Sequence, residues 1–231
     1  MNKYCSKAKE LITKYKHVLP LILFYSAWLL WFEYLEQTVT KQYRVIHMSV
    51  DDHIPFMEVF VIPYILWFGY VAVGFAYFIF THKDDYFRMC IFIFTGMTIF
   101  LIISTLWPNG HHLRPHIMPY DNVFTWLVSH VYQNDTATNL WPSIHVYNSL
   151  GTHLAIAKSA RLSKNKFVQW ASGLLCISIV LSTMLIKQHS VFDVITAFIL
   201  SIVMYVIVYK CDILNAFRSF KLTLIKKPQV E

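Results

Sequence analysis

Apolar stretches long enough to cross a lipid bilayer recur through this chain and constrain its fold more than any other feature. A transmembrane helix needs about 20 mainly apolar residues. Hydrophobic residues make up 56% of the 231 residues and charged residues only 14%, against about 25% charged residues in soluble domains. A soluble domain of this size could not bury so much apolar surface, and the aromatic content of 17% excludes a disordered chain. The sequence therefore predicts an integral membrane protein.

The order of these stretches predicts a single all-α membrane domain over residues 1–231, a bundle of six transmembrane helices. The expected spans are roughly 18–34, 60–80, 89–106, 142–160, 167–186 and 191–209. The fourth is more polar than the others. The basic segment before the first span resembles the start of a signal peptide. Bulky Trp31 and Phe32 lie where small residues would precede a cleavage site, so we expect an uncleaved helix.

The basic residues divide unequally between the two faces of such a bundle. Only four of the 20 Lys and Arg residues fall on one face, which leaves 16 on the face that holds both termini; the four are Lys41, Arg44, Arg114 and Lys187. The positive-inside rule makes the more basic face, with both termini, cytoplasmic. The net charge of +7 then reflects topology and contact with anionic lipids, and does not predict nucleic-acid binding. Short tails and outer loops without cysteine favour a bacterial inner membrane.

Three polar segments, at residues 109–115, 141–145 and 187–193, fall on the predicted outer face although they are far apart in sequence. His189 and Asp193 are four residues apart and therefore share one face of a helix. A carboxylate beside an imidazole fixes its tautomer and raises the basicity of the other nitrogen. This pair suits a histidine nucleophile or base, with Asp193 as its partner inside an apolar span.

The other two segments supply groups that bind an anion and protonate a leaving group. Ser143 is a good helix cap, and the backbone N–H groups from Ile144 onward would favour phosphate at the start of a helix. His145 in the first turn could donate a proton. Arg114 could clamp phosphate oxygens, and Lys187 could add a second cation.

Two further interpretations concern neighbouring residues. Several histidines share the outer side, which leaves a metal site open as an alternative, but no HExxH pattern is present and we expect neither a metal nor another cofactor. These histidines are His111, His112, His116, His145 and His189. The segment 51–56 before the second span is interpreted as a capped turn with an aromatic anchor, separate from the site.

The three segments, in this order, resemble the motifs of the type 2 phosphatidic acid phosphatase superfamily, which are KxxxxxxRP, PSGH and SRxxxxxHxxxD on a six-helix membrane core. The matches are Arg114-Pro115, then Pro142-Ser143-Ile144-His145, then Ser182 with His189 and Asp193. The resemblance implies that His189 forms a phosphohistidine and that Asp193 holds and activates it. It also implies that His145 protonates the departing lipid, while Arg114, Ser143 and the Ile144 N–H hold the phosphoryl oxygens without a metal.

Three motif positions differ from the family pattern. Trp107 and Thr183 stand where the family has Lys and Arg, so two phosphate-binding cations are missing, for which Lys187 or His111 and His112 could substitute. Ile144 replaces the motif glycine, as in the branch that includes inositol phosphorylceramide synthases. Those enzymes transfer a phosphoryl head group between lipids.

We therefore expect a membrane phosphatase that acts on a lipid phosphate at the extracytoplasmic face. The expected substrates are phosphatidic acid, phosphatidylglycerol phosphate or a polyprenyl diphosphate. A lipid phosphotransferase that uses the same histidines is the first alternative, and a non-catalytic transporter or scaffold is the second. The sequence does not predict an oligomeric state.

Overall fold

The protein is described by a computed structural model over residue 10 and residues 13–226, and it is 75% helical with 2% strand. The longer helices are α2 (Leu19–Thr38), α3 (Val61–Thr81), α4 (Lys83–Leu106), α5 (Val123–Asn134), α6 (Ile144–Lys158), α7 (Lys166–Leu185), α8 (Val191–Tyr205) and α9 (Ile213–Lys226). Short helical turns cover Lys16–Val18, Ser49–His53, Glu58–Phe60 and Leu162–Lys164, and a π-helical turn, Val206–Lys210, continues α8. The strands are β1 (Arg44–Val45) and β2 (Asn109–Gly110).

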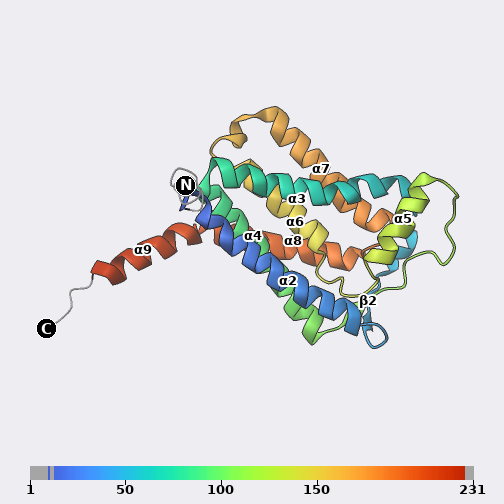
Figure 1. Cartoon of the computed structure of the whole chain (residues 1–231). Coiled ribbons are helices and arrows are strands. Elements are labelled where there is room, and N and C mark those ends of the chain that lie inside the picture. The colour runs from blue at the N-terminus through green and yellow to red at the C-terminus, as the bar shows by residue number, and fades with distance from the viewer. Residues whose placement is uncertain (1–9, 11–12, 227–231) are drawn as a thin grey trace, which may run out of the picture.

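The helices form an elongated bundle with α6 at its centre (Figure 1). Helices α2, α3, α4, α6, α7 and α8 lie along its length, whereas α5 and the strands lie at one end and α9 leaves from the other. Ten of the 15 residues of α6 are buried, and this helix packs against α3, α4, α7 and α8. Helix α2 lies on the outside of the bundle and packs against α4.

Within the described residues, five helical segments are long and apolar enough to cross a membrane: Thr13–Thr38, Glu58–Thr81, Lys83–Leu106, Lys166–Leu185 and Val191–Lys210. The expected span at 142–160 instead forms α6, whose 15 residues extend only about 22 Å, less than the hydrocarbon core of about 30 Å. The chain is thus compatible with an integral membrane protein, whereas the six-span count and the side of the termini stay predictions.

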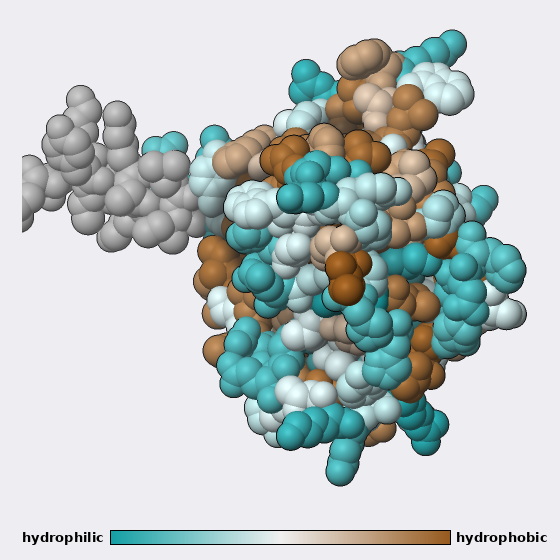
Figure 2. Space-filling model, turned by 90° about the vertical axis from the view of Figure 1, so that its right-hand side faces the viewer, coloured by the Kyte–Doolittle hydropathy of each residue, from teal (hydrophilic) through white to brown (hydrophobic). Residues whose placement is uncertain are grey.

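Large apolar side chains are exposed along the outward surfaces of these helices, including Phe68, Val73, Leu174 and Ile202. Hydrophilic side chains cover much of the end that carries α5, and apolar patches lie mainly toward its margins (Figure 2). This distribution suits apolar helix flanks in lipid and a polar end in water.

The sequence placed the start of the third span six residues too late. Helix α4 begins at Lys83, and only His82 separates it from α3. Asp84 and Asp85 occupy the first turn, where carboxylates stabilise the helix dipole, and the His82 side chain accepts a hydrogen bond from the Asp85 N–H at 3.4 Å. The sequence predicts a loop between the expected spans 60–80 and 89–106, because these polar residues interrupt the apolar run.

Close packing of α4 and α6 sets the position of the central helix. A Cβ atom at Gly96 would overlap the ring of Tyr147, and one at Gly151 would lie 2.7 Å from Cδ1 of Phe92. The Tyr147 hydroxyl donates a hydrogen bond to the Phe92 carbonyl at 2.7 Å. Small residues allow membrane helices to approach this closely. The contact fixes α6, and with it His145 in its first turn.

The loops at the α5 end are held together by a small parallel strand pair. Arg44 and Val45 pair with Asn109 and Gly110. The Asn109 side-chain oxygen accepts hydrogen bonds from the N–H groups of Leu140, at 2.8 Å, and Trp141, at 3.0 Å. This network connects the segment after α2, the segment after α4 and the segment that leads into α6.

Candidate active site

The structure brings His145, His189 and Asp193 together in a buried row, although His145 and His189 are 44 residues apart. His189 Nδ1 lies 3.4 Å from Asp193 Oδ2, as the four-residue spacing predicts. His189 Nε2 lies 3.3 Å from His145 Nδ1. With the Nδ1 proton of His189 directed at the carboxylate, Nε2 is the unprotonated nitrogen and accepts a hydrogen bond from His145. The row therefore presents a basic nitrogen beside a proton donor.

A tight turn between α7 and α8 sets the orientation of His189. The N–H groups of Gln188 and His189 both donate to the Thr183 carbonyl at 2.9 Å. Ser190 caps α8 by accepting a hydrogen bond from the Phe192 N–H at 3.2 Å, and Asp193 Oδ2 accepts one from the Ser190 N–H at 3.0 Å. Asp193 therefore closes the first turn of α8 and holds His189 with the same oxygen.

The carboxylate of Asp193 is not fully satisfied. Its Oδ1 atom is buried and has no hydrogen-bond partner among the described residues. A buried carboxylate with an unpaired oxygen lowers the stability of the fold unless a nearby positive charge or hydrogen-bond donor offsets the cost. The carboxylate can therefore stabilise positive charge that develops on His189 during a reaction.

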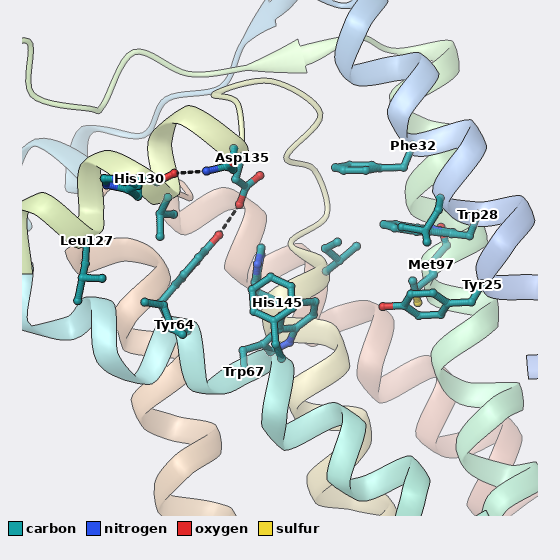
Figure 3. A pocket seen from close by; sticks show the side chains of 16 residues that line it. Tyr25, Trp28, Phe32, Tyr64, Trp67, Met97, Leu127, His130, Asp135 and His145 are labelled. Atoms are coloured by element: carbon teal, nitrogen blue, oxygen red, sulfur yellow. Dashed lines mark hydrogen bonds between the residues drawn. The ribbon is translucent and has the colours of Figure 1, made fainter. Parts of the chain in front are cut away.

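His145 lies between aromatic rings at the edge of a cavity. Its ring centroid is 4.6 Å from that of Tyr64 and 4.4 Å from that of Trp67, both on α3. The cavity has a volume of about 380 Å³. Figure 3 shows Tyr25 and Trp28 of α2 facing Tyr64, Trp67 and His145 across it. A ligand in this cavity would touch His145 directly.

Ser143 caps α6 as expected from the sequence. It is fully buried, and its hydroxyl accepts a hydrogen bond from the Val146 N–H at 3.3 Å. Its own N–H donates to the Asp193 carbonyl at 3.3 Å, which joins the start of α6 to the first turn of α8. Ile144 follows as the first residue of α6, in contact with the cavity. The helix start is thus directed at the histidine row.

The Arg114 guanidinium lies beside the turn that carries His189. It donates to the carbonyls of Tyr132, Asp135 and Thr136 at 3.2, 2.6 and 2.8 Å, and also to the side-chain oxygen of Gln188. Its Nε atom is buried and has no hydrogen-bond partner in the described part of the chain. Arg114 therefore stabilises the segment after α5. Its predicted role as a phosphate clamp depends on Nε, the guanidinium nitrogen that these contacts do not use.

Lys187 is directed toward the loop between α2 and α3 instead. Its ammonium donates to the carbonyls of Asp51 and Ile54 at 2.9 and 2.6 Å, from a residue with a left-handed φ of 56°. Burial lowers the pKa of Lys187, an effect that the carboxylates of Asp51 and Asp52 oppose. These contacts do not bring the ammonium to the histidine row, and phosphate binding by Lys187 stays a prediction.

Asp51 contributes to the site more than its sequence context indicated. Its carboxylate accepts hydrogen bonds from the Ser190 hydroxyl at 2.6 Å and from the Val191 N–H at 2.8 Å. The turn at 49–53 is present, as interpreted from the sequence, but its buried Asp51 also fixes the start of α8. Two consecutive aspartates before a span were the only signal for this, and a capping turn explains them equally well.

Gln188 and Tyr64 form a polar layer above the row that the sequence did not predict. The Tyr64 hydroxyl donates to Asp135 Oδ2 at 2.5 Å, and the Gln188 amide lies 3.3 Å from both groups. Gln188 is adjacent to His189 in sequence, which is the one signal that could have identified it. Tyr64 lies within an apolar span, where nothing distinguishes it from other aromatic residues.

His111 supports the same turn from the other side. Its Nε2 lies 2.9 Å from the Gln188 carbonyl, and its Nδ1 accepts the Leu113 N–H at 3.2 Å, so the buried ring is neutral with both nitrogens bonded. Burial, assisted by nearby His189 and Arg114, lowers the pKa of His111 from 6.5 to about 4.

This shift predicts a loss of stability in mild acid. The unfolded chain binds the His111 proton from about pH 6.5 downward while the folded protein resists it to about pH 4. Stability is therefore complete above pH 6.5 and falls by up to about 3 kcal/mol as the pH drops through this window. Thermal unfolding in detergent at pH 7 and pH 5 measures the effect. We expect His111→Gln, which keeps a donor and an acceptor, to lose less stability on acidification; equal losses would contradict the assignment.

The two residues that replace family cations lie in different surroundings. Trp107 is exposed at the end of α4, whereas Thr183 is buried under the α7–α8 turn. Neither supplies a charge to the histidine row. No group of three or more His, Cys, Asp or Glu residues within the described part of the chain could hold a metal ion.

Comparison of the chain with protein-family models, with curated proteins and with solved structures found no match. The resemblance to lipid phosphate phosphatases therefore depends on the motif residues themselves. Of these, His145, His189 and Asp193 meet in one buried row beside a cavity.

Proposed function

We propose that this protein is a membrane phosphatase that hydrolyses a lipid phosphate through a phosphohistidine. The observation that carries the proposal is the row Asp193–His189–His145, in which a carboxylate orients one imidazole and a second imidazole faces its free nitrogen at 3.3 Å. An oriented nucleophile beside a general acid is the arrangement that nucleophilic phosphoryl transfer requires. The adjoining aromatic cavity supports a lipid substrate.

The proposed first step transfers the phosphoryl group to the protein. The entering phosphoryl group displaces the hydrogen bond between the two histidines, and His189 Nε2 attacks phosphorus. A P–N bond forms, the P–O bond to the lipid breaks, and the lipid oxygen takes the proton of His145. Asp193 stabilises the positive charge on the His189 ring.

The proposed second step regenerates the protein with water. His145, now without its proton, accepts one from a water molecule that attacks phosphorus. A P–O bond forms, the P–N bond to His189 breaks, and inorganic phosphate leaves. The N–H groups at the start of α6 support binding of the phosphoryl oxygens, because the start of a helix favours anions.

The proposed topology places both termini in the cytoplasm and the site at the extracytoplasmic face, in a bacterial inner membrane. The distribution of Lys and Arg residues supports this orientation. Phosphatidic acid, phosphatidylglycerol phosphate and polyprenyl diphosphate are the proposed substrates, and no metal takes part in the scheme.

A product assay in ¹⁸O-labelled water tests the proposal. The purified protein is incubated with each candidate lipid phosphate, and we expect released phosphate to carry one oxygen from the solvent. Ile144, at the position of the motif glycine, favours a phosphotransferase as the second candidate. That function would yield a new lipid phosphodiester with no solvent oxygen, and it would contradict hydrolysis.

A further inference from the structure

Two cavities meet along the gap between α2 and α3. Their volumes are about 380 and 570 Å³, and the residues that line both are Tyr25, Leu29, Trp67, Phe68 and Met97. We call the joined space the α2–α3 groove. It follows α3 from Tyr64 to Ile79, a distance of about 22 Å, which exceeds half of the hydrocarbon core of about 30 Å.

The groove exists because α2 is attached to α4 and only loosely to the rest of the bundle. Trp28 Nε1 donates to the Met97 carbonyl at 3.2 Å, and Trp31 Nε1 donates to the Thr105 hydroxyl at 3.1 Å. Only 11% of the most apolar window of Thr13–Thr38 is buried. The side of α2 that faces α3 is thus left open to the surrounding lipid.

The groove is polar at one end and apolar along the rest, as a lipid is polar at its head group and apolar along its chain. His130, Asn134 and Asp135 line the end near α5, and His145 follows. Beyond His145 the walls are almost entirely apolar, down to Leu21 and Ile79. A phosphate at the histidine row would therefore lie at the polar end, with the attached hydrocarbon directed along the groove.

A buried amide, besides Ser26 of α2, interrupts the apolar part. Asn148 lies on α6 three residues after His145, so the two residues share a helix face. It lines the groove and is only 2% exposed, yet its side-chain oxygen has no hydrogen-bond partner among the described residues. A buried amide with an unpaired oxygen lowers the stability of the fold, a cost that a role in binding a polar group of a ligand would explain.

We propose that the α2–α3 groove binds one hydrocarbon chain of the substrate lipid, and that the Asn148 NH₂ group donates a hydrogen bond to the carbonyl of the ester or amide linkage between that chain and the phosphate. The inference rests on the proposed function for the identity of the phosphate. It assigns the substrate to acyl lipids such as phosphatidic acid, because a polyprenyl chain carries no polar group at this depth. The Asn148 oxygen could accept only from an amide N–H, because an ester has no donor.

The first test separates acyl from polyprenyl lipids. We expect Asn148→Leu to lower kcat/KM for phosphatidic acid about fivefold relative to a polyprenyl phosphate, the effect of one neutral hydrogen bond. The Tm should stay the same or rise, because the amide oxygen has no hydrogen-bond partner among the residues that the structure describes. Equal effects on both lipids, or a lower Tm with no change in the substrate ratio, would overturn the role of Asn148.

The second test blocks the groove away from the histidines. Ala72 lines the groove, whereas its neighbour Val73 is 68% exposed on the outward face of α3. We expect Ala72→Trp to reduce hydrolysis of long-chain phosphatidic acid at least tenfold and to spare a short-chain soluble analogue. Val73→Trp is the matched control and should leave both activities intact. If Ala72→Trp and Val73→Trp behave alike, the groove does not hold the chain.

A binding experiment keeps this inference separable from the proposed function. Phosphatidic acid with a diazirine at the end of one acyl chain is cross-linked to His189→Ala, and the labelled residues are mapped by mass spectrometry. We expect labels at Ile22 and Ala76, deep in the groove. Groove labels without any hydrolysis by the wild type would reject the phosphatase and retain the groove. Labels confined to outward residues such as Leu174 and Ile199, with hydrolysis intact, would reject the groove alone.

Discussion

His189→Ala should reduce phosphate release from lipid phosphates by at least about a thousandfold, because it removes the nitrogen that attacks phosphorus. His189 Nε2 is the free nitrogen of the row, and neither His145 nor Asp193 can take its place without moving. Steady-state phosphate release from detergent-solubilised protein measures the loss. The wild type, but not the variant, should also retain ³²P on histidine after rapid acid-free quenching of a reaction with labelled substrate.

The matched control is His116→Ala, which changes an exposed histidine in the loop before α5. It should keep wild-type turnover and phosphohistidine formation. Retention of wild-type turnover by His189→Ala would reject His189 as nucleophile. If His189→Ala and His116→Ala both lost turnover, the result would show that both changes damage folding.

Asp193→Asn should lower turnover about 10³- to 10⁴-fold, the size of effect expected when the carboxylate that sets a histidine tautomer is neutralised. An amide oxygen in the place of Oδ2 accepts the Nδ1 proton more weakly than a carboxylate does, and the neutral side chain no longer stabilises the positive charge that forms on His189 during attack. kcat for phosphatidic acid measures the effect.

Folding should survive the Asp193→Asn change. The amide oxygen can still accept the Ser190 N–H bond, and the second carboxylate oxygen has no partner among the described residues. We therefore expect a Tm equal to or above that of the wild type. Asp52→Asn, which removes an exposed carboxylate bonded to His47 at 2.8 Å, should affect neither quantity. A low Tm for Asp193→Asn would indicate a structural role in place of a catalytic one.

The sequence predicted the residues of the histidine row better than it predicted the residues that surround them. Two local rules, the i,i+4 spacing of His189 and Asp193 and the Ser143 cap, correspond to contacts in the structure. Hydropathy alone gave the five long helices, because length and polarity decide which segments suit a bilayer. The meeting of His145 with His189 followed only from placing both on one side of the membrane.

The remainder could not be predicted, because membrane helices are apolar on all sides. An amphipathic helix shows which face packs inward, whereas α3 carries aromatic residues all around its axis. The sequence therefore did not indicate that Tyr64 and Trp67 contact His145, or that Arg114 is engaged by carbonyl groups after α5. The expected fourth span, 142–160, was also too long at both ends, because Ser143 caps α6 and the helix ends at Lys158.

The one-residue junction at His82 has a consequence for how the protein is made. Consecutive Cα atoms are about 3.8 Å apart, so the end of α3 and the start of α4 cannot separate by more than about 8 Å. During biosynthesis the end of α3 and the start of α4 therefore arrive at the same membrane surface, and Lys83 in the first turn of α4 lies there with them. Neither helix end can cross the bilayer without the other moving with it.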